Sequence, residues 1–412
     1  MKRLLILGAG KEQVPAITRA KAKGIYTIVL DMNKEAEGFK YADESYSISI
    51  RDEESLLNFV WSYDKKIDGV ITIASDIPHM VSRVAEKLHV RHIPVESADL
   101  TVDKLKMKET LLAAGVNIPA FKKINSLEEL SQFIKEHGYP VVIKPVDNSG
   151  ARGVLKITEG VDLDWTINES KKSSRSGTVM VEKFIEGLQI STEGIMYKDK
   201  LYITGFADRN YENLDLFAPN IIEDGGDSPT RLTDEEKRLV NVEFEKAVRA
   251  LGIDWGPGKG DMVFSNGKAF VIEIAARLSG GNFCYDHIPL GTGVDIVDAY
   301  IDMAVGNEID VNCLKAKFQK GVAQRYFFPG TGKIKEINGL DKVKNINNIV
   351  KIELFVKEGD VIEKQVNHTT RVGYVIAVGK DKKEAVKLAK EAINSVNFTF
   401  EEVNIIQGEG VV

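Results

Sequence analysis

The sequence predicts an α/β protein with more than one domain. Its 412 residues exceed a typical domain, and a prior of about 150 residues per domain suggests two to four. Short apolar runs alternate with helical stretches through roughly the first hundred residues, which is typical of right-handed βαβ units and a mostly parallel sheet. An antiparallel hairpin is indicated around residue 266, and strands mixed with a helix follow residue 321. The last part therefore resembles a small α+β domain.

The composition is that of an ordinary globular protein. Hydrophobic residues make up 43% and charged residues 28% of the chain, and the net charge of −6 gives no reason to expect nucleic-acid or membrane partners. No run approaches the roughly 18 apolar residues that span a bilayer. Cys284 and Cys313 match no metal spacing and are too few for a disulfide framework. We therefore expect a cytoplasmic protein with reduced thiols.

The first apolar run, 4–7, ends in a glycine-rich turn. Gly8-x-Gly10-x-x-Gln13 approaches the dinucleotide fingerprint, and Asp31 lies near the place of a ribose-binding acid. The third glycine, which permits close packing of helix and strand, is missing. The turn could instead bind a carboxylate or phosphate through its free amides. A nicotinamide-dependent oxidoreductase built on this turn stays an alternative.

A single lysine ends a buried-type strand in the middle of the chain. The run 139–145 carries Lys144 in an otherwise uncharged sequence. A buried, unpaired ammonium group is costly, and an anionic phosphate would supply its partner. Upstream, the basic stretch 103–108 lies within a helix expected over 99–114. That stretch is either a solvated face or a second source of phosphate contacts.

A turn rich in glycine, serine and arginine follows at once, between Asp147 and Val154. Its glycines let backbone amides approach phosphate oxygens, and Arg152 adds a fork of donors. No Gly-Lys-Ser/Thr follows, so the turn is not a Walker A loop. A flexible surface hairpin is the other interpretation.

Two strand-like runs, 262–264 and 269–274, are joined by a segment that contains Asn-Gly, the strongest short-range hairpin signal. Antiparallel pairing would bring the carboxylates of Asp261 and Glu273 together, with Arg277 close behind. Two hard oxygen ligands beside a guanidinium suit Mg²⁺ carrying a polyphosphate. An ordinary amphipathic hairpin with an acidic end has the same pattern.

Three further features lie outside these motifs. The stretch 205–228 has no clear periodicity and is long for an inert connection, so we predict a mobile substrate or cover loop. His287 lies just beyond Arg277, where it either meets a substrate or is structural. Arg325 stands in an apolar, strand-like run, where its guanidinium either pairs structurally or receives a substrate carboxylate.

The order of these motifs resembles the ATP-grasp superfamily. The series is a basic helix lysine, a strand ending in Lys-Pro, the Ser-Gly-Ala-Arg-Gly loop, Glu-Lys-Phe-Ile-Glu-Gly at 182–187, and the acidic hairpin with Glu-x-x-x-Arg. It covers about residues 100–310. Residues 1–100 are similar to the parallel α/β domain that precedes the ATP-grasp domain in this family. The resemblance implies two α+β lobes in 101–310, with a mobile lobe at about 115–182, and a lid-like domain at 311–412 similar to that of L-amino-acid ligases.

The resemblance also implies roles for matching residues. ATP and Mg²⁺, with Mn²⁺ as a substitute, are the expected cofactors. Catalytic residues would be Arg277, Lys144, Ser149 and Arg152; nucleotide-binding residues would be Lys104, Lys144, Ser149, Gly150, Gly153, Glu182, Lys183, Phe184, Ile185 and Gln189; metal ligands would be Asp261 and Glu273; and substrate contacts would be Arg325, His287 and Gly280.

Two positions depart from the family pattern. Gln189 stands where a ribose-binding acid is usual, with Glu193 further on. Glu273-Ile274-Ala275 replaces the family's Glu-x-Asn, which leaves the number of magnesium ions open.

The expected activity is that of an ATP-dependent carboxylate–amine ligase. It would form an acyl-phosphate from a carboxylate and then an amide or peptide-like bond, with release of ADP and phosphate. Its partners would be small-molecule carboxylate and amine substrates, and a homodimer is compatible with the sequence. Bicarbonate or a sugar acid could replace the amino acid as the activated group. A non-catalytic nucleotide-binding module is a further alternative, because of Ala275 and Gln189.

Overall fold

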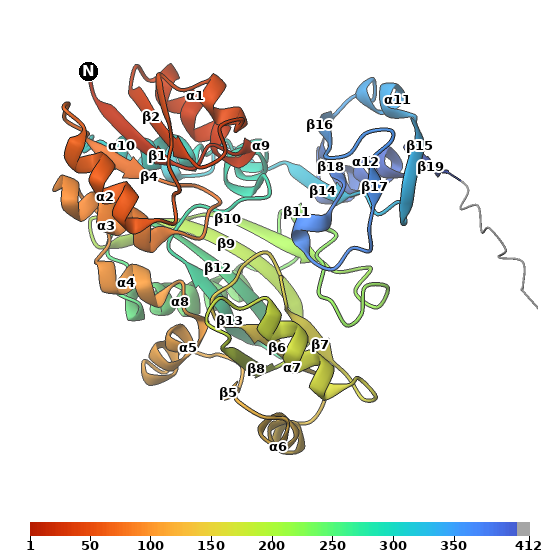
Figure 1. Ribbon diagram of the computed structural model, residues 1–412. Helices are drawn as coiled ribbons and strands as arrows, with labels where there is room; N and C mark the ends of the chain where they lie inside the picture. Colours follow the sequence, from red (N-terminus) through yellow and green to blue (C-terminus); the bar gives the residue numbers. More distant parts are fainter. Residues whose placement is uncertain (402–412) are drawn as a thin grey trace, which may run out of the picture.

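A computed structural model describes residues 1–401, which form four sheets with helices on their faces (Figure 1). Residues 402–412, at the end of the expected carboxyl-terminal domain, lie outside the described part. Within 1–401, no helix combines the length and the apolar character needed to cross a membrane.

The amino-terminal sheet is parallel, as predicted. Its strand order is β3 (Glu44–Ser47), β2 (Tyr26–Asp31), β1 (Arg3–Leu7) and β4 (Gly69–Ile71). The four residues 4–7 of β1 are fully buried, as expected for a parallel strand covered on both faces. The helices that follow these strands are α1 (Val14–Ala22), α2 (Glu53–Ser62) and α3 (Pro78–Leu88), with short 3₁₀ turns η1 (Lys11–Gln13) and η2 (Glu37–Lys40).

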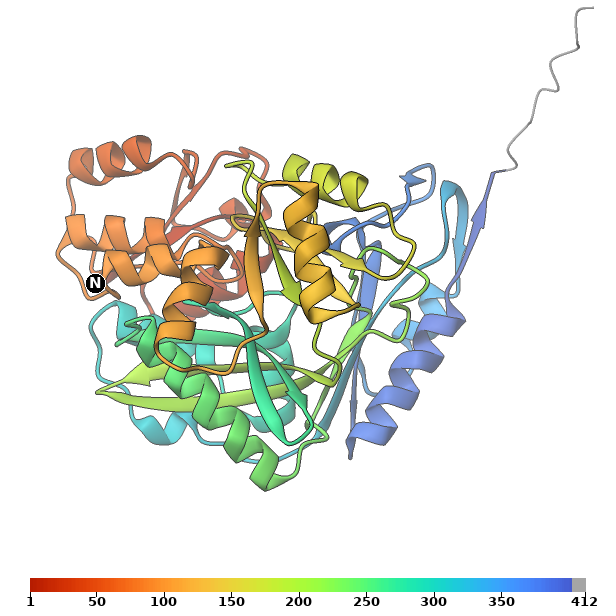
Figure 2. The same ribbon diagram turned by 90° about the horizontal axis from the view of Figure 1, so that it is seen from below.

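A four-stranded antiparallel sheet forms a small lobe over residues 121–183, close to the range expected for the mobile lobe (Figure 2). Its order is β5 (Phe121–Ile124), β8 (Val179–Lys183), β6 (Val141–Pro145) and β7 (Leu155–Ile157), covered by α6 (Leu127–His137) and α7 (Leu163–Lys172). The Ser126 side chain accepts a hydrogen bond from the Glu129 amide and caps α6. We call residues 121–183 the small lobe.

The largest sheet has eight strands and crosses the predicted boundary at residue 310. Strands β14 (Gly321–Tyr326), β18 (Gly373–Gly379) and β16 (Ile349–Leu354) belong to the expected carboxyl-terminal domain, yet they extend this sheet. They do so because the free edge of β11 (Gly225–Ser228) pairs with β14, from Gly225 opposite Arg325 to Ser228 opposite Val322. The order is β13 (Lys268–Ala275), β12 (Gly256–Ser265), β9 (Leu188–Tyr197), β10 (Lys200–Asn210), β11 (Gly225–Ser228), β14 (Gly321–Tyr326), β18 (Gly373–Gly379) and β16 (Ile349–Leu354).

Part of the stretch 205–228 is strand rather than loop. Residues 205–208 pair with β9, and 208–210 pair with β11, so the connection is confined to 211–224. The prediction of a loop over the whole stretch was wrong because its polar residues, including Arg209, stand on a strand that faces a polar cleft.

The expected helix over 99–114 is interrupted. The chain forms α4 (Val95–Leu100) and α5 (Lys104–Ala113), and the Asp103 side chain accepts hydrogen bonds from Leu105 and Lys106 to cap α5. The remaining elements are α8 (Asp234–Ala250), η3 (Phe283–His287), α9 (Ile288–Thr292), α10 (Ile296–Ala304), η4 (Val311–Leu314), β15 (Gly332–Asn338), α11 (Leu340–Lys344), β17 (Val361–Ile362), η5 (His368–Thr370), α12 (Lys382–Ser395) and β19 (Asn397–Phe400). Strands β17, β15 and β19 form a small sheet of their own.

Candidate active site

A cleft of about 910 Å³ opens between the small lobe, the large sheet, the amino-terminal turns and the carboxyl-terminal strands. Of the residues expected at the site, only Gly153 and Arg325 are not part of its lining. The expected residues that line it are Lys104, Lys144, Ser149, Gly150, Arg152, Glu182, Lys183, Phe184, Ile185, Gln189, Asp261, Glu273, Arg277, Gly280 and His287.

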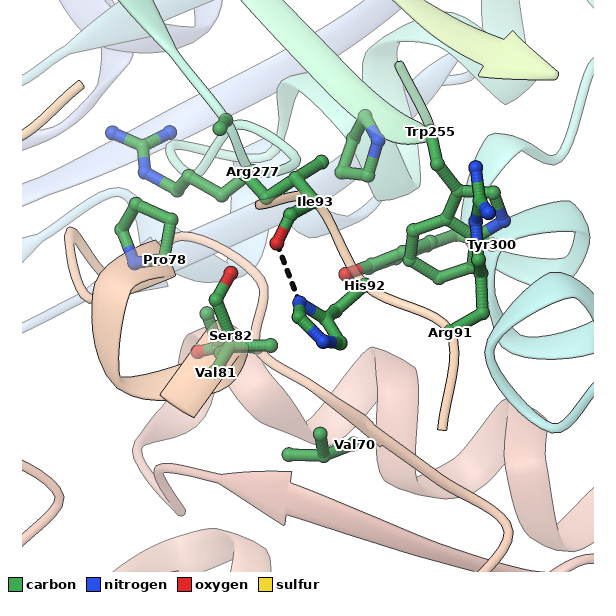
Figure 3. A pocket seen from close by; sticks show the side chains of 13 residues that line it. Val70, Pro78, Val81, Ser82, Arg91, His92, Ile93, Trp255, Arg277 and Tyr300 are labelled. Atoms are coloured by element: carbon green, nitrogen blue, oxygen red, sulfur yellow. Dashed lines mark hydrogen bonds between the residues drawn. The ribbon is translucent and has the colours of Figure 1, made fainter. Parts of the chain in front are cut away.

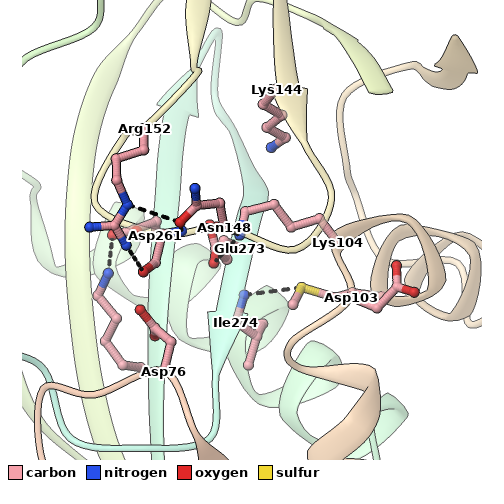
Figure 4. Close-up of polar contacts among 12 residues, drawn as sticks. Asp76, Asp103, Lys104, Lys144, Asn148, Arg152, Asp261, Glu273 and Ile274 are labelled. Atoms are coloured by element: carbon pink, nitrogen blue, oxygen red, sulfur yellow. Dashed lines mark hydrogen bonds and ion pairs between the residues drawn. The ribbon is translucent and has the colours of Figure 1, made fainter. Parts of the chain in front are cut away.

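The acidic hairpin forms as the sequence predicts. Asn266 and Gly267 both have positive φ (50° and 74°) between β12 and β13, which is the geometry of the tight hairpin turn favoured by Asn-Gly. The register places Asp261 directly opposite Glu273, and both side chains face the cleft (Figure 4). The predicted pairing of the two carboxylates is confirmed.

Basic side chains already neutralise both carboxylates. Asp261 Oδ1 lies 2.6 Å from Lys259 Nζ and 2.9 Å from Arg209 Nη1, and Glu273 Oε1 lies 3.0 Å from Lys104 Nζ. Burial disfavours the ionised form of Asp261, but Arg209 and Lys259 outweigh it and hold the pKa of this carboxyl well below its usual value. Asp261 is therefore a carboxylate at any working pH.

The donor set fits one magnesium ion. Mg²⁺ is commonly held by one or two carboxylates together with water and substrate phosphates, and Asp261 and Glu273 supply two. Among residues 1–401, no group of three or more histidine, cysteine or acidic side chains gathers as an all-protein metal cage. Ala275 contributes no ligand, and its cross-strand partner Lys259 brings an ammonium group to the same place.

Lys144 has an internal partner. Its Nζ lies 2.7 Å from Glu182 Oε2, and the buried Lys108 Nζ lies 3.1 Å from the other oxygen of Glu182. Burial lowers the pKa of Lys108 to about 8. The Glu182 side chain thus serves as a counter-ion for two lysines rather than facing a base, and a phosphate would compete with it for Lys144.

Replacing Lys144 by alanine is expected to raise the dissociation constant for ATP about 30-fold or more, because a charged hydrogen bond to phosphate contributes roughly 1.5–3 kcal/mol. The free energy of unfolding should fall less than on breaking an isolated buried ion pair, because Glu182 remains paired with Lys108 in the variant. Calorimetric titration of ATP into the variant checks this. Lys123→Ala, on the exposed edge of the small lobe, is the control, and an unchanged ATP affinity in Lys144→Ala would contradict the phosphate role.

The glycine loop, defined as residues 147–154, is organised by its own side chains. Arg152 donates to Asn148 Oδ1 at 2.9 Å and to Ser149 Oγ at 3.0 Å. Gly153 has φ 70°, and a Cβ there would lie 2.6 Å from Ser173 Cβ, so this glycine permits close packing against the end of α7. Gly153 does not line the cleft, and its nucleotide-binding role stays a prediction.

The stretch expected as the hinge, 182–185, lies at the end of β8 and directly after it. Lys183 Nζ donates to the carbonyls of Gly138 and Tyr139, which ties this stretch to the residues just before β6. The Lys156 ammonium lies 4.6 Å from the centre of the Phe184 ring. Gln189 begins β9 and faces the cleft opposite Val263. Phe184, Ile185 and Gln189 therefore line one continuous wall.

Arg277 lies at the far end of the cleft. Its Nε and Nη2 approach Asp76 Oδ1 at 2.8 and 2.5 Å. Burial opposes the ionised form of Asp76, but Arg277 outweighs it and lowers the pKa of Asp76 to about 2. The following turn is held by buried Glu193, which accepts hydrogen bonds from the Ser279 amide (2.6 Å) and hydroxyl (2.7 Å). Burial raises the pKa of Glu193 to about 7, and the residue does not reach the nucleoside wall.

The two substrate candidates beyond residue 281 differ in position. His287 lines the cleft, and its Nε2 lies 3.1 Å from the Val322 carbonyl oxygen. Burial lowers the pKa of His287, so the ring is neutral. Arg325 is buried and makes two contacts with Asp227, at 2.6 and 3.1 Å. Its geometry favours the structural interpretation over a contact with a substrate carboxylate.

Arg325→Met should lower the free energy of unfolding by about 3–5 kcal/mol, because it leaves the Asp227 carboxylate buried without its cation. Chemical denaturation checks this value. The double variant Arg325→Met with Asp227→Asn should recover part of the loss. A variant of normal stability that no longer responds to its acid substrate would instead assign Arg325 to substrate binding.

The sequence did not single out several residues that complete the site. Arg209 bridges Asp261 and Glu223, and Glu223 also takes a backbone contact from Arg371. Asp76 follows the end of β4, the edge of a parallel sheet where ligands commonly bind, and this signal could have indicated it. The residues are Glu12, Asp76, Lys259, Arg209, Glu223, His368 and Arg371.

The glycine-rich first turn is filled by side chains. Gln13 stands where the third glycine of a dinucleotide fingerprint would be, and its amide group exchanges hydrogen bonds with the backbone of Ile73. Asp31 Oδ2 accepts a hydrogen bond from the Ala9 amide at 2.9 Å. Both groups are engaged in holding β1, β2 and β4 together, which disfavours a nicotinamide site here.

A small cavity of about 20 Å³ lies behind the cleft, between the amino-terminal domain and β12 (Figure 3). Its volume is about that of one water molecule. His92 Nδ1 lies 2.6 Å from the Ile93 carbonyl oxygen there, and the Arg277 guanidinium points away (Figure 3). This cavity is too small for a substrate.

Comparison with known proteins assigns the family. Residues 101–281 match the ATP-grasp domain, and residues 325–401 match L-amino acid ligase C-terminal domain 2. Residues 101–281 therefore form an ATP-grasp domain. The predicted family, α/β fold class and class of enzyme, an ATP-dependent ligase, are thereby confirmed.

Relatives of this ATP-grasp protein cover most of its length. An uncharacterised protein of Sinorhizobium fredii is 24% identical over 400 residues, which is 95% of this chain and 80% of that one. Alanine–anticapsin ligase of Bacillus subtilis is 27% identical over 265 residues, covering 60% of this chain and 56% of the ligase. The crystal structure of L-amino acid ligase from Bacillus licheniformis has a similar fold, with a TM-score of 0.83 at 20% identity, over 98% of this chain and 99% of that one.

Proposed function

We propose that this ATP-grasp protein joins a small carboxylic acid to an amine at the expense of ATP. The observation that carries the proposal is the pairing of Asp261 with Glu273 across the hairpin, in one cleft with Arg277 and the glycine loop. Phosphoryl transfer needs mainly positioning and neutralisation of charge. These groups can supply both.

The nucleotide would lie along the wall from the hinge to the hairpin. Phe184 and Ile185 would flank the base beside Lys183, and Gln189 would contact the ribose. Lys104 and Lys144 would exchange Glu273 and Glu182 for phosphate oxygens. Ser149, Gly150 and Arg152 would close over the transferred phosphoryl group. Asp261 and Glu273 would hold Mg²⁺, or Mn²⁺ in its place, which supplies positive charge to the β- and γ-phosphates when bound.

The reaction would proceed in two steps. A carboxylate oxygen attacks the γ-phosphorus, and the bond between this phosphorus and the oxygen of the β-phosphate breaks. The products of this step are an acyl-phosphate and ADP. The amine nitrogen then attacks the acyl carbon, phosphate leaves, and the nitrogen loses a proton. Arg277 would stabilise the charge on the phosphoryl oxygens in both steps. A closed small lobe would keep water from the acyl-phosphate.

The test is release of ADP and phosphate from Mg-ATP across a panel of amino-acid pairs and other carboxylic acids, with mass detection of products. Acid-dependent ADP release together with a new amide supports the ligase. ATP binding without turnover on any acid would favour a non-catalytic module, and NADH binding without ATP binding would favour an oxidoreductase.

The nature of the acid is a finer proposal. The match of residues 325–401 to L-amino acid ligase C-terminal domain 2 supports an amino acid among the substrates. Turnover with bicarbonate or a sugar acid, and with no amino acid, would instead identify that acid as the group that is activated. Small molecules are the proposed partners, and light scattering would test the predicted homodimer.

A further inference from the structure

One partly buried carboxylate in the cleft, that of Glu12, forms no ion pair among the described residues. Five acidic side chains of the lining, those of Asp76, Glu182, Glu223, Asp261 and Glu273, each form an ion pair with lysine or arginine. Among the described residues, the lining carboxylates of Glu12 and Glu186 form none. Glu186 is exposed, whereas Glu12 is partly buried.

Glu12 is fixed in place by neutral groups. Its Oε2 accepts a hydrogen bond from the Gly281 amide at 2.9 Å, and the Tyr285 hydroxyl also bonds to it. A Cβ at Gly280 would lie 2.7 Å from Oε2, so the absence of a side chain there lets the carboxylate approach the turn. Burial raises the pKa of Glu12, because neutral donors only partly replace the lost hydration.

The nearest cations are committed to other acids. Lys351 Nζ lies 2.8 Å from Asp286 Oδ2, and Arg277 is bound to Asp76. A partly buried carboxylate with an open side toward a substrate cleft is stabilised by a cation that enters with the substrate.

Aromatic rings form the wall beside this carboxylate. Tyr326 and Tyr374 meet edge to face with centres 6.2 Å apart, and Phe355 lies 5.8 Å from Tyr374. All three line the cleft. Each ring already has a protein cation near its face, namely Arg371 for Tyr326, Lys351 for Tyr374 and Lys11 for Phe355. The rings therefore contribute an apolar wall to this part of the cleft rather than free cation-binding faces.

We propose that Glu12 binds the α-ammonium group of an amino acid whose carboxylate is activated. This inference rests on the proposed ligase function. The ammonium and carboxylate groups of an α-amino acid are bonded to one carbon, so its site needs an anion and a cation close together. Glu12 accepts a hydrogen bond from the Gly281 amide at the end of the short turn 277–281, and Arg277, which begins this turn, keeps Asp76 as its counter-ion while it faces the cleft.

The first arm of the test compares matched acids in the wild-type protein. Acid-dependent ADP release is measured with L-alanine and propanoate, L-leucine and 4-methylpentanoate, L-glutamate and glutarate, and L-phenylalanine and 3-phenylpropanoate. We expect kcat/KM for the responding amino acid to exceed that of its des-amino partner at least ~100-fold, since an unpaired buried charge is costly. Equal use of both members of a pair overturns the inference.

The second arm uses Glu12→Gln, which keeps an acceptor for the Gly281 amide but removes the charge. In this variant the KM for the amino acid should rise ~30-fold or more. The rate with the matching des-amino acid should stay within about two-fold of the wild-type rate. Glu308→Gln, at an exposed acid outside the cleft, is the matched control, and ATP affinity and thermal unfolding report an intact fold. An unchanged preference in Glu12→Gln overturns the assignment.

The outcomes separate this inference from the ligase proposal. Turnover with des-amino acids alone leaves a ligase standing and removes the ammonium site. No ADP release with any acid removes both.

Discussion

Glu273→Gln lowers ADP release at least ~1,000-fold at saturating substrates while the fold remains intact. The substitution removes one of two charged metal ligands, and metal stabilisation of the transferring phosphoryl group contributes several kcal/mol, where about 1.4 kcal/mol corresponds to ten-fold in rate. Glu273 lies at the cleft surface opposite Asp261, so no core packing is lost. Rapid-quench measurement of ADP, with circular dichroism for the fold, checks the result.

A metal readout makes this test independent of activity. In the presence of a non-hydrolysable ATP analogue, Mn²⁺ bound to wild type should be measurable by electron paramagnetic resonance and weakened in Glu273→Gln. Glu308→Gln, an exposed acid far from the cleft, should behave as wild type. Full turnover and normal Mn²⁺ affinity in Glu273→Gln would remove this residue from the metal site.

Arg277→Lys is expected to lower the rate of phosphoryl transfer ~100- to 1,000-fold and to change the affinity for ATP less than about three-fold. Lysine keeps the positive charge beside Asp76 but loses the planar fork that can hold two phosphoryl oxygens at once. Loss of one donor to a developing oxyanion costs a factor of this size. Single-turnover ADP formation separates this effect from product release.

The control for this substitution is Arg238→Lys, on the exposed face of α8 and paired with Glu235. It changes the same chemical group without touching the cleft. A wild-type single-turnover rate in Arg277→Lys would mean that the guanidinium serves only to hold Asp76 and the turn after it.

The parts of the site that depend on residues close together in the sequence were predictable. Asn-Gly between two apolar runs sets the register from Ser265–Lys268 to Met262–Val271, because a two-residue turn leaves little freedom to the strands. A β-bulge between Asp261 and Met262, which the sequence pattern does not indicate, then brings Asp261 opposite Glu273. A strand with one terminal lysine, followed by a glycine-rich turn, likewise placed Lys144 and the loop on one wall.

The counter-ions were not predictable, because they come from distant segments. Asp76 meets Arg277 across 201 residues of sequence, and Lys11 meets Glu353 across 342. No periodicity or spacing reports such contacts. For the same reason the sequence of the strand 141–145 predicts a phosphate partner for Lys144 but not its ion pair with Glu182, which stands on another strand.

Contacts between distant segments also explain why the large sheet crosses the predicted boundary at residue 310. The pattern of strands after 321 predicts a separate α+β unit, but an edge strand accepts any partner with a suitable backbone. Strand β14 pairs with β11 and so joins the eight-stranded sheet. The same strand pairing explains why the sequence could not decide between a structural and a substrate-binding role for Arg325. The partner that favours the structural role, Asp227, lies on β11.

Besides the contact of Lys104 Nζ with the Asn148 carbonyl at 2.7 Å, two backbone hydrogen bonds join the glycine loop and the strand after it to segments outside the small lobe. Its Gly150 carbonyl accepts a hydrogen bond from the His368 amide at 3.1 Å, and nearby Lys156 donates its amide to the Pro219 carbonyl at 2.7 Å. Each such bond contributes only about 0.5–1.5 kcal/mol net, so releasing both costs about as much as a thermal fluctuation that recurs constantly. Under the proposed function, we therefore expect the nucleotide to be released by a local opening of this loop that leaves the surrounding helices and strands folded.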